Sequence, residues 1–178
     1  EQDAAKPACP QVVCKVEASL YDGYLDVVEA TLPGETDEEI LVVAHLCHPR
    51  ASANDNASGV SCAMEIVRVL KQLVDTKQIP PLKRGVRMIL VPEFSGTYAW
   101  LHGHQELLPR ILAGINLDMV GGRQTKGYGP LSICGQPHAN PAIVTDAAAL
   151  CLDEVKKNAQ STGGRDMVPM FNSHITAY

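Results

Sequence analysis

The sequence has no long apolar run, no excess of positive charge and no closely spaced pair of cysteines. Its longest apolar runs fall well short of the roughly 20 residues needed to cross a bilayer, which disfavours a membrane-spanning protein. The net charge of −5 disfavours binding to nucleic acid or to an anionic membrane surface. With 178 residues, of which 46% are hydrophobic and 20% charged, the chain is expected to form one globular domain with a sizeable core.

The six cysteines are spread along the chain, and none of them belongs to a C-x-x-C pair. Cys62 and Cys151 fall in apolar stretches with helical spacing. A chain of this length does not need disulfides for its stability. We therefore expect buried free thiols rather than three disulfides, and hence a reducing compartment, the cytoplasm.

Strand-like and helix-like apolar patterns alternate along the chain, which predicts an α/β fold with a mostly parallel sheet covered on both faces. Residues 40–45 are almost wholly apolar, as expected of a strand buried on both faces. Residues 24–32 alternate in character and predict an edge strand. The other predicted strands cover residues 11–16, 86–91, 115–118, 131–134 and 168–171, and the predicted helices cover residues 56–72, 96–108 and 141–157.

Ligand-type side chains stand where three of the predicted apolar strands end. They are His45, Glu93 and Asp118, and a fourth residue, Asp55, lies in the loop after His45. Parallel strands bring their carboxyl ends to one edge of a sheet, where open α/β folds bind ligands, so the four side chains could converge. One histidine and two carboxylates suit a borderline divalent ion such as Zn²⁺, with one position left for water. A further carboxylate near that water could act as a general base.

Each of these residues also has an ordinary structural explanation. Asp55 could cap the helix that is predicted to begin near Asn56, and Asp118 could occupy a turn before two glycines. Glu93 could simply be exposed, and His45 could be a hydrogen-bonded histidine in the core. Because all four stand at strand ends or in one loop, their combined positions favour a functional site over four unrelated explanations.

Three short segments, together with His45, carry a resemblance to a known family. They are residues 52–59 (SANDNASG), residues 92–97 (PEFSGT) and residues 115–121 (INLDMVG). In this order and with these gaps, the chain resembles the M28-type zinc aminopeptidases, and more narrowly their bacterial aminopeptidase-like relatives. The similarity spans residues 40–122.

The resemblance implies a three-layer α/β sandwich of the zinc-peptidase type (phosphorylase/hydrolase-like) with a cocatalytic zinc pair. His45 and Asp118 would hold one metal, and Asp55 would bridge the two. Glu93 would be the general base. We further expect residues 1–178 to form a single metallopeptidase-like catalytic domain that is incomplete at its C-terminus.

The sequence departs from the family pattern at the second metal. Cys47 stands where the family usually has an aspartate, and Phe94 stands where it usually has a second glutamate. The last family ligand is a histidine near the carboxyl end, for which His174 is the candidate. His48 could replace a missing ligand or could stabilise its own loop. We therefore expect one zinc site, with a second that depends on His48 or His174.

These residues predict a metal-dependent hydrolase that cleaves peptide or amide bonds, in the manner of an aminopeptidase, with a water activated by the metal and by Glu93. The expected substrate is a peptide or an aminoacyl small molecule, and the oligomeric state is left open. One alternative is a non-catalytic pseudo-peptidase domain with a binding or regulatory role, which the loss of the second glutamate favours and the retention of Glu93 opposes. Another is glutaminyl-cyclase-like amide chemistry on the same fold. A thiol nucleophile built from Cys47 and His48 is disfavoured, since adjacent side chains rarely point at each other.

Overall fold

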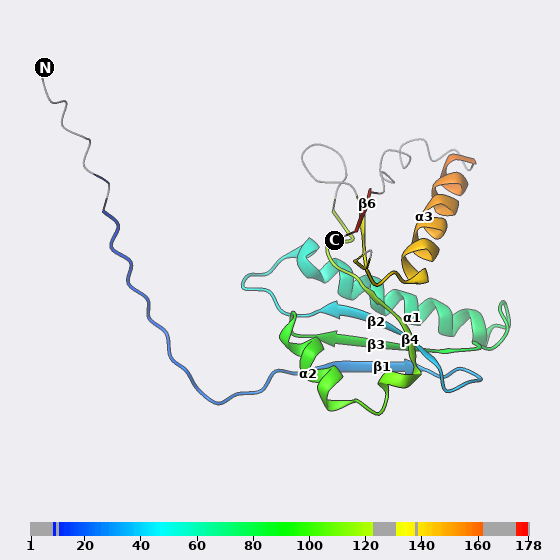
Figure 1. The fold of residues 1–178 in the computed structure, drawn as a ribbon, viewed down its shortest axis with the longest axis horizontal. Helices are drawn as coiled ribbons and strands as arrows, with labels where there is room; N and C mark the ends of the chain where they lie inside the picture. The colour runs from blue at the N-terminus through cyan, green and yellow to red at the C-terminus, as the bar shows by residue number, and fades with distance from the viewer. Residues whose placement is uncertain (1–8, 10, 123–130, 138, 162–173, 178) are drawn as a thin grey trace, which may run out of the picture.

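The computed structural model describes residue 9 and residues 11–122, 131–137, 139–161 and 174–177. Its centre is a four-stranded sheet in the order β1-β3-β2-β4 (Figure 1). β2, β3 and β4 run parallel, and β1 pairs antiparallel with β3 at one edge. The predicted α/β fold, its mostly parallel sheet and the edge strand are therefore confirmed. The four strands are β1 (Val28–Leu32), β2 (Glu39–His45), β3 (Gly85–Val91) and β4 (Ile111–Asn116).

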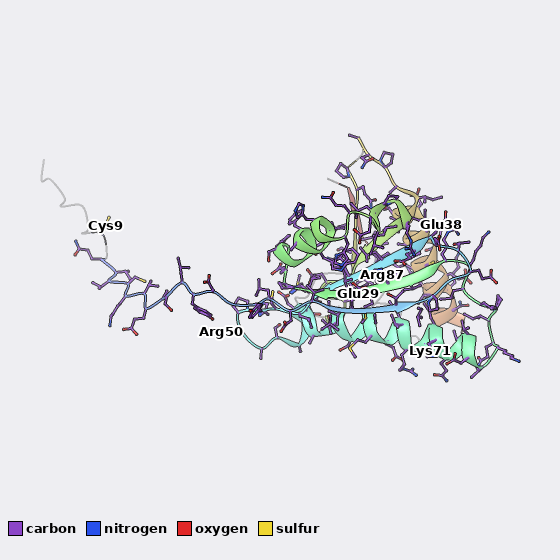
Figure 2. All side chains as sticks on the ribbon, turned by 90° about the horizontal axis from the view of Figure 1, so that it is seen from below. Cys9, Glu29, Glu38, Arg50, Lys71 and Arg87 are labelled. Atoms are coloured by element: carbon purple, nitrogen blue, oxygen red, sulfur yellow. The ribbon has the colours of Figure 1, made fainter. Side chains whose placement is uncertain are left out.

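Two hydrophobic clusters cover opposite faces of this sheet, because successive side chains along a strand point to alternate sides. α1 (Gly59–Asp75) packs over one face, and α2 (Ser95–Gly103) packs over the other with Trp100 buried. Figure 2 shows the sheet between the two helices, with α1 in cyan below it and α2 in green above it. Burial on both faces explains why the two central strands are almost wholly apolar. The buried strand residues are Val42, Ala44, Val86, Met88 and Leu90 on the α1 side, and Leu41, Val43, Ile89 and Val91 on the α2 side.

A network of ion pairs joins the strands on the α2 side of the sheet. Glu39, which is buried, accepts two hydrogen bonds from Arg87, at 2.6 and 2.9 Å, and one from Arg110. Arg87 also pairs with Glu29, whose other oxygen accepts the indole N–H of Trp100 at 2.9 Å. Glu29 and Arg87 lie together on the sheet in Figure 2. The hydrogen bonds from Arg87 hold the pKa of Glu39 below its ordinary value, against the opposing effect of burial.

The predicted strand at residues 11–16 is wrong. Residues 11–27 form neither helix nor strand, and they lead away from the body as an extended arm (Figure 1). Val13, Leu20 and Tyr24 in this arm are almost fully exposed. A strand-like pattern forms a strand only where a neighbour accepts its backbone hydrogen bonds, and the arm has no such neighbour in the described structure. For the same reason β1 is shorter than the predicted segment 24–32.

Two predicted helices have different bounds in the structure. The first begins at Gly59 rather than near Asn56 and is preceded by a π-helical turn, η1 (Ala53–Ser58). The second ends at Gly103, and a short 3-10 helix, η2 (Leu108–Arg110), leads directly into β4. Pro109 lies inside η2, where its missing N–H costs little.

The remaining elements are α3 (Ile143–Ser161) and a parallel pair of short strands, β5 (Ser132–Gly135) and β6 (His174–Ala177). α3 and β5 confirm the predicted helix at 141–157 and the predicted strand at 131–134. The predicted strand at residues 168–171 lies outside the described residues. None of the helices in the described part of the chain has the length and apolar content that a bilayer crossing requires.

The expectation of buried thiols is wrong for most of the cysteines. Cys62 on α1 is partly buried, whereas the other five are exposed. Cys14 belongs to the extended arm, and Cys151 lies on an exposed side of α3. Helical spacing of apolar residues identified α3 correctly but did not show which of its faces is covered.

Candidate metal centre

The carboxyl ends of β2, β3 and β4 lie at one edge of the sheet, and a predicted site residue stands at or just after each of them. His45 is the last residue of β2, Glu93 follows β3 and Asp118 follows β4. Asp55 lies in η1, between β2 and α1. The parallel pairing of the three strands is what brings these residues, which are far apart in sequence, to one place.

His45, Asp55 and Asp118 meet at this edge. Nε2 of His45 lies 3.0 Å from Oδ1 of Asp55 and 3.6 Å from Oδ1 of Asp118. One ligand-type atom from each residue lies within 4.8 Å of the others. Two ligands of a tetrahedral zinc ion, each about 2.1 Å from the metal, lie about 3.4 Å apart, so the spacing fits a shared cation. The structure thus brings the three residues together as expected, and their role as metal ligands stays a prediction.

The ring of His45 is oriented as a metal-binding imidazole would be. Its side chain is only 5% exposed, and Nδ1 lies 2.8 Å from the carbonyl oxygen of Cys47. A carbonyl oxygen only accepts hydrogen bonds, so Nδ1 carries a proton, and Nε2 is the nitrogen left to bind a cation.

Nε2 of His45 is buried and has no hydrogen-bond partner among the described residues. The Asp55 oxygen is near enough for an ion pair, but it does not meet hydrogen-bond geometry. An unsatisfied buried polar atom costs about 1–3 kcal/mol. A cation between Nε2 and the two carboxylates would remove this cost, so the donor set fits a metal.

Asp55 also faces a second histidine. Its Oδ2 atom lies 3.2 Å from Nε2 of His48, on the carboxylate oxygen that His45 does not approach. The sequence left the role of His48 open, and the structure places it on Asp55. His174 is the first residue of β6, where it pairs with Ser132 of β5.

A pocket of about 240 Å³ is lined by Glu93 together with His45 and Asp118 of the three-residue centre. Glu93 is exposed, and its backbone N–H donates to Sγ of Cys47 at 3.1 Å. Cys47 therefore helps to place Glu93, a contact that the sequence did not suggest. The pocket is lined by Val43, His45, Val91, Glu93, Phe94, Thr97, Tyr98, Asn116 and Asp118.

The residues that directly follow Glu93 and Asp118 both have left-handed backbone conformations. Phe94 has a φ of 51° and Met119 a φ of 49°. Such angles are uncommon for residues other than glycine, and they concentrate at functional sites. In each case the chain turns sharply just after a carboxylate, which keeps that carboxylate at the end of its strand.

Two asparagines on either side of Asp55 join the loops that carry the two carboxylates. Buried Asn56 donates from Nδ2 to the Leu117 carbonyl at 2.9 Å, and its Oδ1 accepts the N–H groups of Met119 and Gly59. Asn54 accepts the N–H of Gly121 at 3.1 Å. The Asn-Asp-Asn order around Asp55 was the only sequence signal for these contacts. It was ambiguous, because asparagine is also a common helix-cap residue.

Comparisons with known proteins identify the family. Residues 6–160 match the family model DUF4910, described as a domain of unknown function. The chain belongs to the DUF4910 family. The match covers most of the chain, and the motifs around His45, Asp55, Glu93 and Asp118 all fall inside it.

A relative of this DUF4910 chain in Clostridium acetobutylicum carries a provisional name, polysaccharide biosynthesis protein with aminopeptidase-like domain. It is 34% identical over 113 residues, which are 64% of this chain and 24% of the relative. A crystal structure from the same organism, provisionally titled a peptidase, superposes with a TM-score of 0.57 at 21% identity. That match covers 85% of this chain and 29% of the other, and it shows a likeness of fold. The DUF4910 chain therefore spans about a quarter of the length of its curated relative.

Proposed function

We propose that this DUF4910 chain forms a metal-dependent hydrolase of the M28 type, which removes N-terminal residues from peptides or aminoacyl amides. The observation that carries the proposal is the buried Nε2 atom of His45, which lacks a hydrogen bond and faces the carboxylates of Asp55 and Asp118. The aminopeptidase-like name of the curated relative points the same way.

Zn²⁺ is the proposed ion. One imidazole nitrogen and two carboxylate oxygens are ligands that zinc accepts, and three protein ligands leave a tetrahedral ion one open position. Asp55 and Asp118 are each about one-third exposed, so substrate and water can reach the centre. When bound there, the ion would lower the pKa of a water molecule and polarise a carbonyl group.

Glu93 is proposed as the general base. It shares the pocket with His45 and Asp118 but does not belong to the three-residue cluster, which suits a residue that handles protons rather than metal. Its carboxylate would take a proton from water as the water oxygen attacks the substrate carbonyl carbon. The same carboxylate would return a proton to the amine as the C–N bond breaks.

The proposal includes the three-layer fold and the single catalytic domain that the family resemblance implies. α1 and α2 cover opposite faces of the sheet, which supports a three-layer sandwich of the zinc-peptidase type. The chain would be part of one catalytic domain, and the peptide or aminoacyl substrate would enter the pocket beside Phe94 and Tyr98. A site kept only for binding or regulation would not need a carboxylate at position 93.

A panel of aminoacyl p-nitroanilides tests the proposal, with chelator-treated protein assayed before and after addition of Zn²⁺. Zinc should restore release of p-nitroaniline, and N-acetylated versions of the same substrates should not react. Zinc-loaded protein that hydrolyses nothing would favour the non-catalytic alternative. Cyclisation of a peptide with N-terminal glutamine, without any hydrolysis, would favour glutaminyl-cyclase-like chemistry.

A further inference from the structure

We propose that Cys47 is a positioning residue for the reaction, whose thiol holds the general base Glu93 in place. Sγ of Cys47 accepts the backbone N–H of Glu93 at 3.1 Å, and the carbonyl oxygen of Cys47 accepts Nδ1–H of His45 at 2.8 Å. One residue therefore contacts both a candidate metal ligand and the candidate base. The proposal rests on the function proposed above, because it assigns the thiol to the placement of that base.

The contact between Cys47 and Glu93 lies just beyond the point where the pairing of β2 with β3 ends. The last paired residues are His45 and Val91, and one further bond runs from the Leu46 N–H to the Val91 carbonyl at 2.8 Å. Cys47 and Glu93 each lie two residues beyond that last pair. A regular parallel ladder joins strands through backbone groups, whereas here a side chain supplies the acceptor. The thiol thus extends the link between the two strands as far as the base.

The chain on the other side of Glu93 makes a tight turn. Phe94 has a φ of 51° and a ψ of −64°, and the N–H of Ser95 donates to the carbonyl oxygen of Glu93. These are the features of a γ-turn with a positive central φ, which is rare and strained. Such a conformation persists where the surrounding structure over-determines it. The thiol of Cys47 is one such restraint, because it fixes the N–H of the residue whose carbonyl closes the turn.

The carboxylate of Glu93 depends on its backbone for its position. The residue is exposed, and among the described residues none donates a hydrogen bond to this carboxylate. The carboxylate shares its pocket with His45 and Asp118, so a shift of the backbone moves the base relative to the candidate centre. Misplacement of a reacting group by about 1 Å can lower a rate by about 100-fold. Loss of the thiol contact should therefore lower turnover rather than metal binding.

Substitution of Cys47 separates its two contacts. Every substitution keeps the backbone carbonyl that accepts from His45, whereas alanine removes the sulfur that accepts from Glu93. In Cys47→Ala, kcat for an aminoacyl p-nitroanilide should fall by about 10–100-fold, while KM and zinc content stay near their wild-type values. Cys47→Ser keeps a hydrogen-bond acceptor and should recover most of the lost turnover, which a role as thiol nucleophile would not allow. Cys151→Ala, at an exposed cysteine on α3, is the control.

Hydrogen exchange of the Glu93 amide, followed by NMR, tests the contact without relying on turnover. A backbone N–H that loses its hydrogen-bond acceptor exchanges faster with solvent. Exchange should therefore be faster in Cys47→Ala than in wild type, and Cys47→Ser should restore protection. Cys151→Ala should leave the exchange of this amide unchanged.

The outcomes separate this proposal from the function that it rests on. Wild-type kcat in Cys47→Ala, with or without faster exchange at Glu93, would overturn the positioning role and leave the proposed function in place. Loss of zinc from Cys47→Ala would also overturn it, because the thiol would then support the ligands rather than the base. A zinc-loaded wild-type protein that hydrolyses no substrate would overturn the proposed function, and the role of Cys47 with it.

Discussion

Asn56 donates a hydrogen bond from its side-chain amide to the carbonyl oxygen of Leu117, at 2.9 Å. Asp55 directly precedes Asn56, and Asp118 directly follows Leu117. This one contact therefore joins the loops that carry the two candidate carboxylate ligands. The contact limits how far the two carboxylates can move apart, which is the preorganisation that the proposed metal site would require.

Replacement of Asn56 by alanine should lower both stability and metal affinity. The change removes the partner of the Leu117 carbonyl and of the Gly59 and Met119 N–H groups. We expect the free energy of unfolding to fall by about 1–3 kcal/mol, and zinc affinity to fall by about 10–100-fold. Urea unfolding and zinc titration measure the two effects, with exposed Asn140→Ala as the control. Unchanged zinc affinity in Asn56→Ala would show that Asn56 does not position the ligands.

Gly59→Ala should destabilise the protein, although alanine normally stabilises a helix by about 1 kcal/mol relative to glycine. A Cβ atom at this position would lie 2.2 Å from the Leu117 carbonyl oxygen and 2.3 Å from Oδ1 of Asn56. Gly103→Ala on α2 is the matched control, because a Cβ there meets nothing within 4 Å. Thermal unfolding of both variants compares them, and a higher melting temperature for Gly59→Ala would contradict the close approach of α1 to the Asp118 loop.

Glu39 should make the fold sensitive to acid. Its folded pKa is lowered by the hydrogen bonds from Arg87, so its stabilising charge is fully present above the ordinary value of 4.5. That contribution is lost as pH falls through the lowered folded pKa. In Glu39→Gln, the free energy of unfolding at pH 7 should be lower by up to about 3 kcal/mol, since the largely buried Arg87 keeps Glu29 but loses its second carboxylate partner.

The pH dependence separates Glu39 from the other carboxylates. Urea unfolding between pH 7 and pH 3 should show a shallower loss of stability in Glu39→Gln than in wild type. Glu65→Gln is the control, because Glu65 also pairs with an arginine but on the exposed surface, where such pairs contribute little. Parallel pH profiles for wild type and Glu39→Gln would contradict the role assigned to this network.

Asp118→Ala should reduce the zinc retained by the purified protein. The change removes one of three ligands, and the carboxylate is exposed enough that its loss should leave the fold intact. Metal analysis after dialysis measures the effect, and Asp153→Asn on the surface of α3 serves as the control. A fully loaded Asp118→Ala protein would remove Asp118 from the proposed ligand set.

The sequence predicted the sheet well where burial on both faces left an unambiguous apolar pattern. β2 and β3 were found within one residue of their bounds, and the meeting of His45, Asp55 and Asp118 followed from parallel strands ending at one edge. The strand predicted at residues 11–16 failed because strand formation depends on a pairing partner that local sequence does not reveal.

Other features of the site depend on contacts between distant residues. The hydrogen bond from Asn56 to Leu117 and the contact of Cys47 with Glu93 join separate loops, so no local pattern indicates them. The position of His48 on Asp55 depends on the course of its own loop, and the sequence left it open between two roles. The positions of the ligand-type residues at the strand ends were predictable from the sequence, whereas the contacts that hold their loops in place were not.

The most direct test of the proposed function compares wild type with Glu93→Gln for turnover of an aminoacyl p-nitroanilide and for zinc content in the same preparations. Glutamine keeps the shape of the side chain and removes the proton acceptor, and exposed Glu106→Gln is the control. General bases typically contribute about 10²–10⁴-fold, so turnover in Glu93→Gln should fall by that factor while zinc content stays at the wild-type level. Unchanged turnover, or loss of zinc together with activity, would contradict the assignment of Glu93 as the base of a metal-dependent hydrolase.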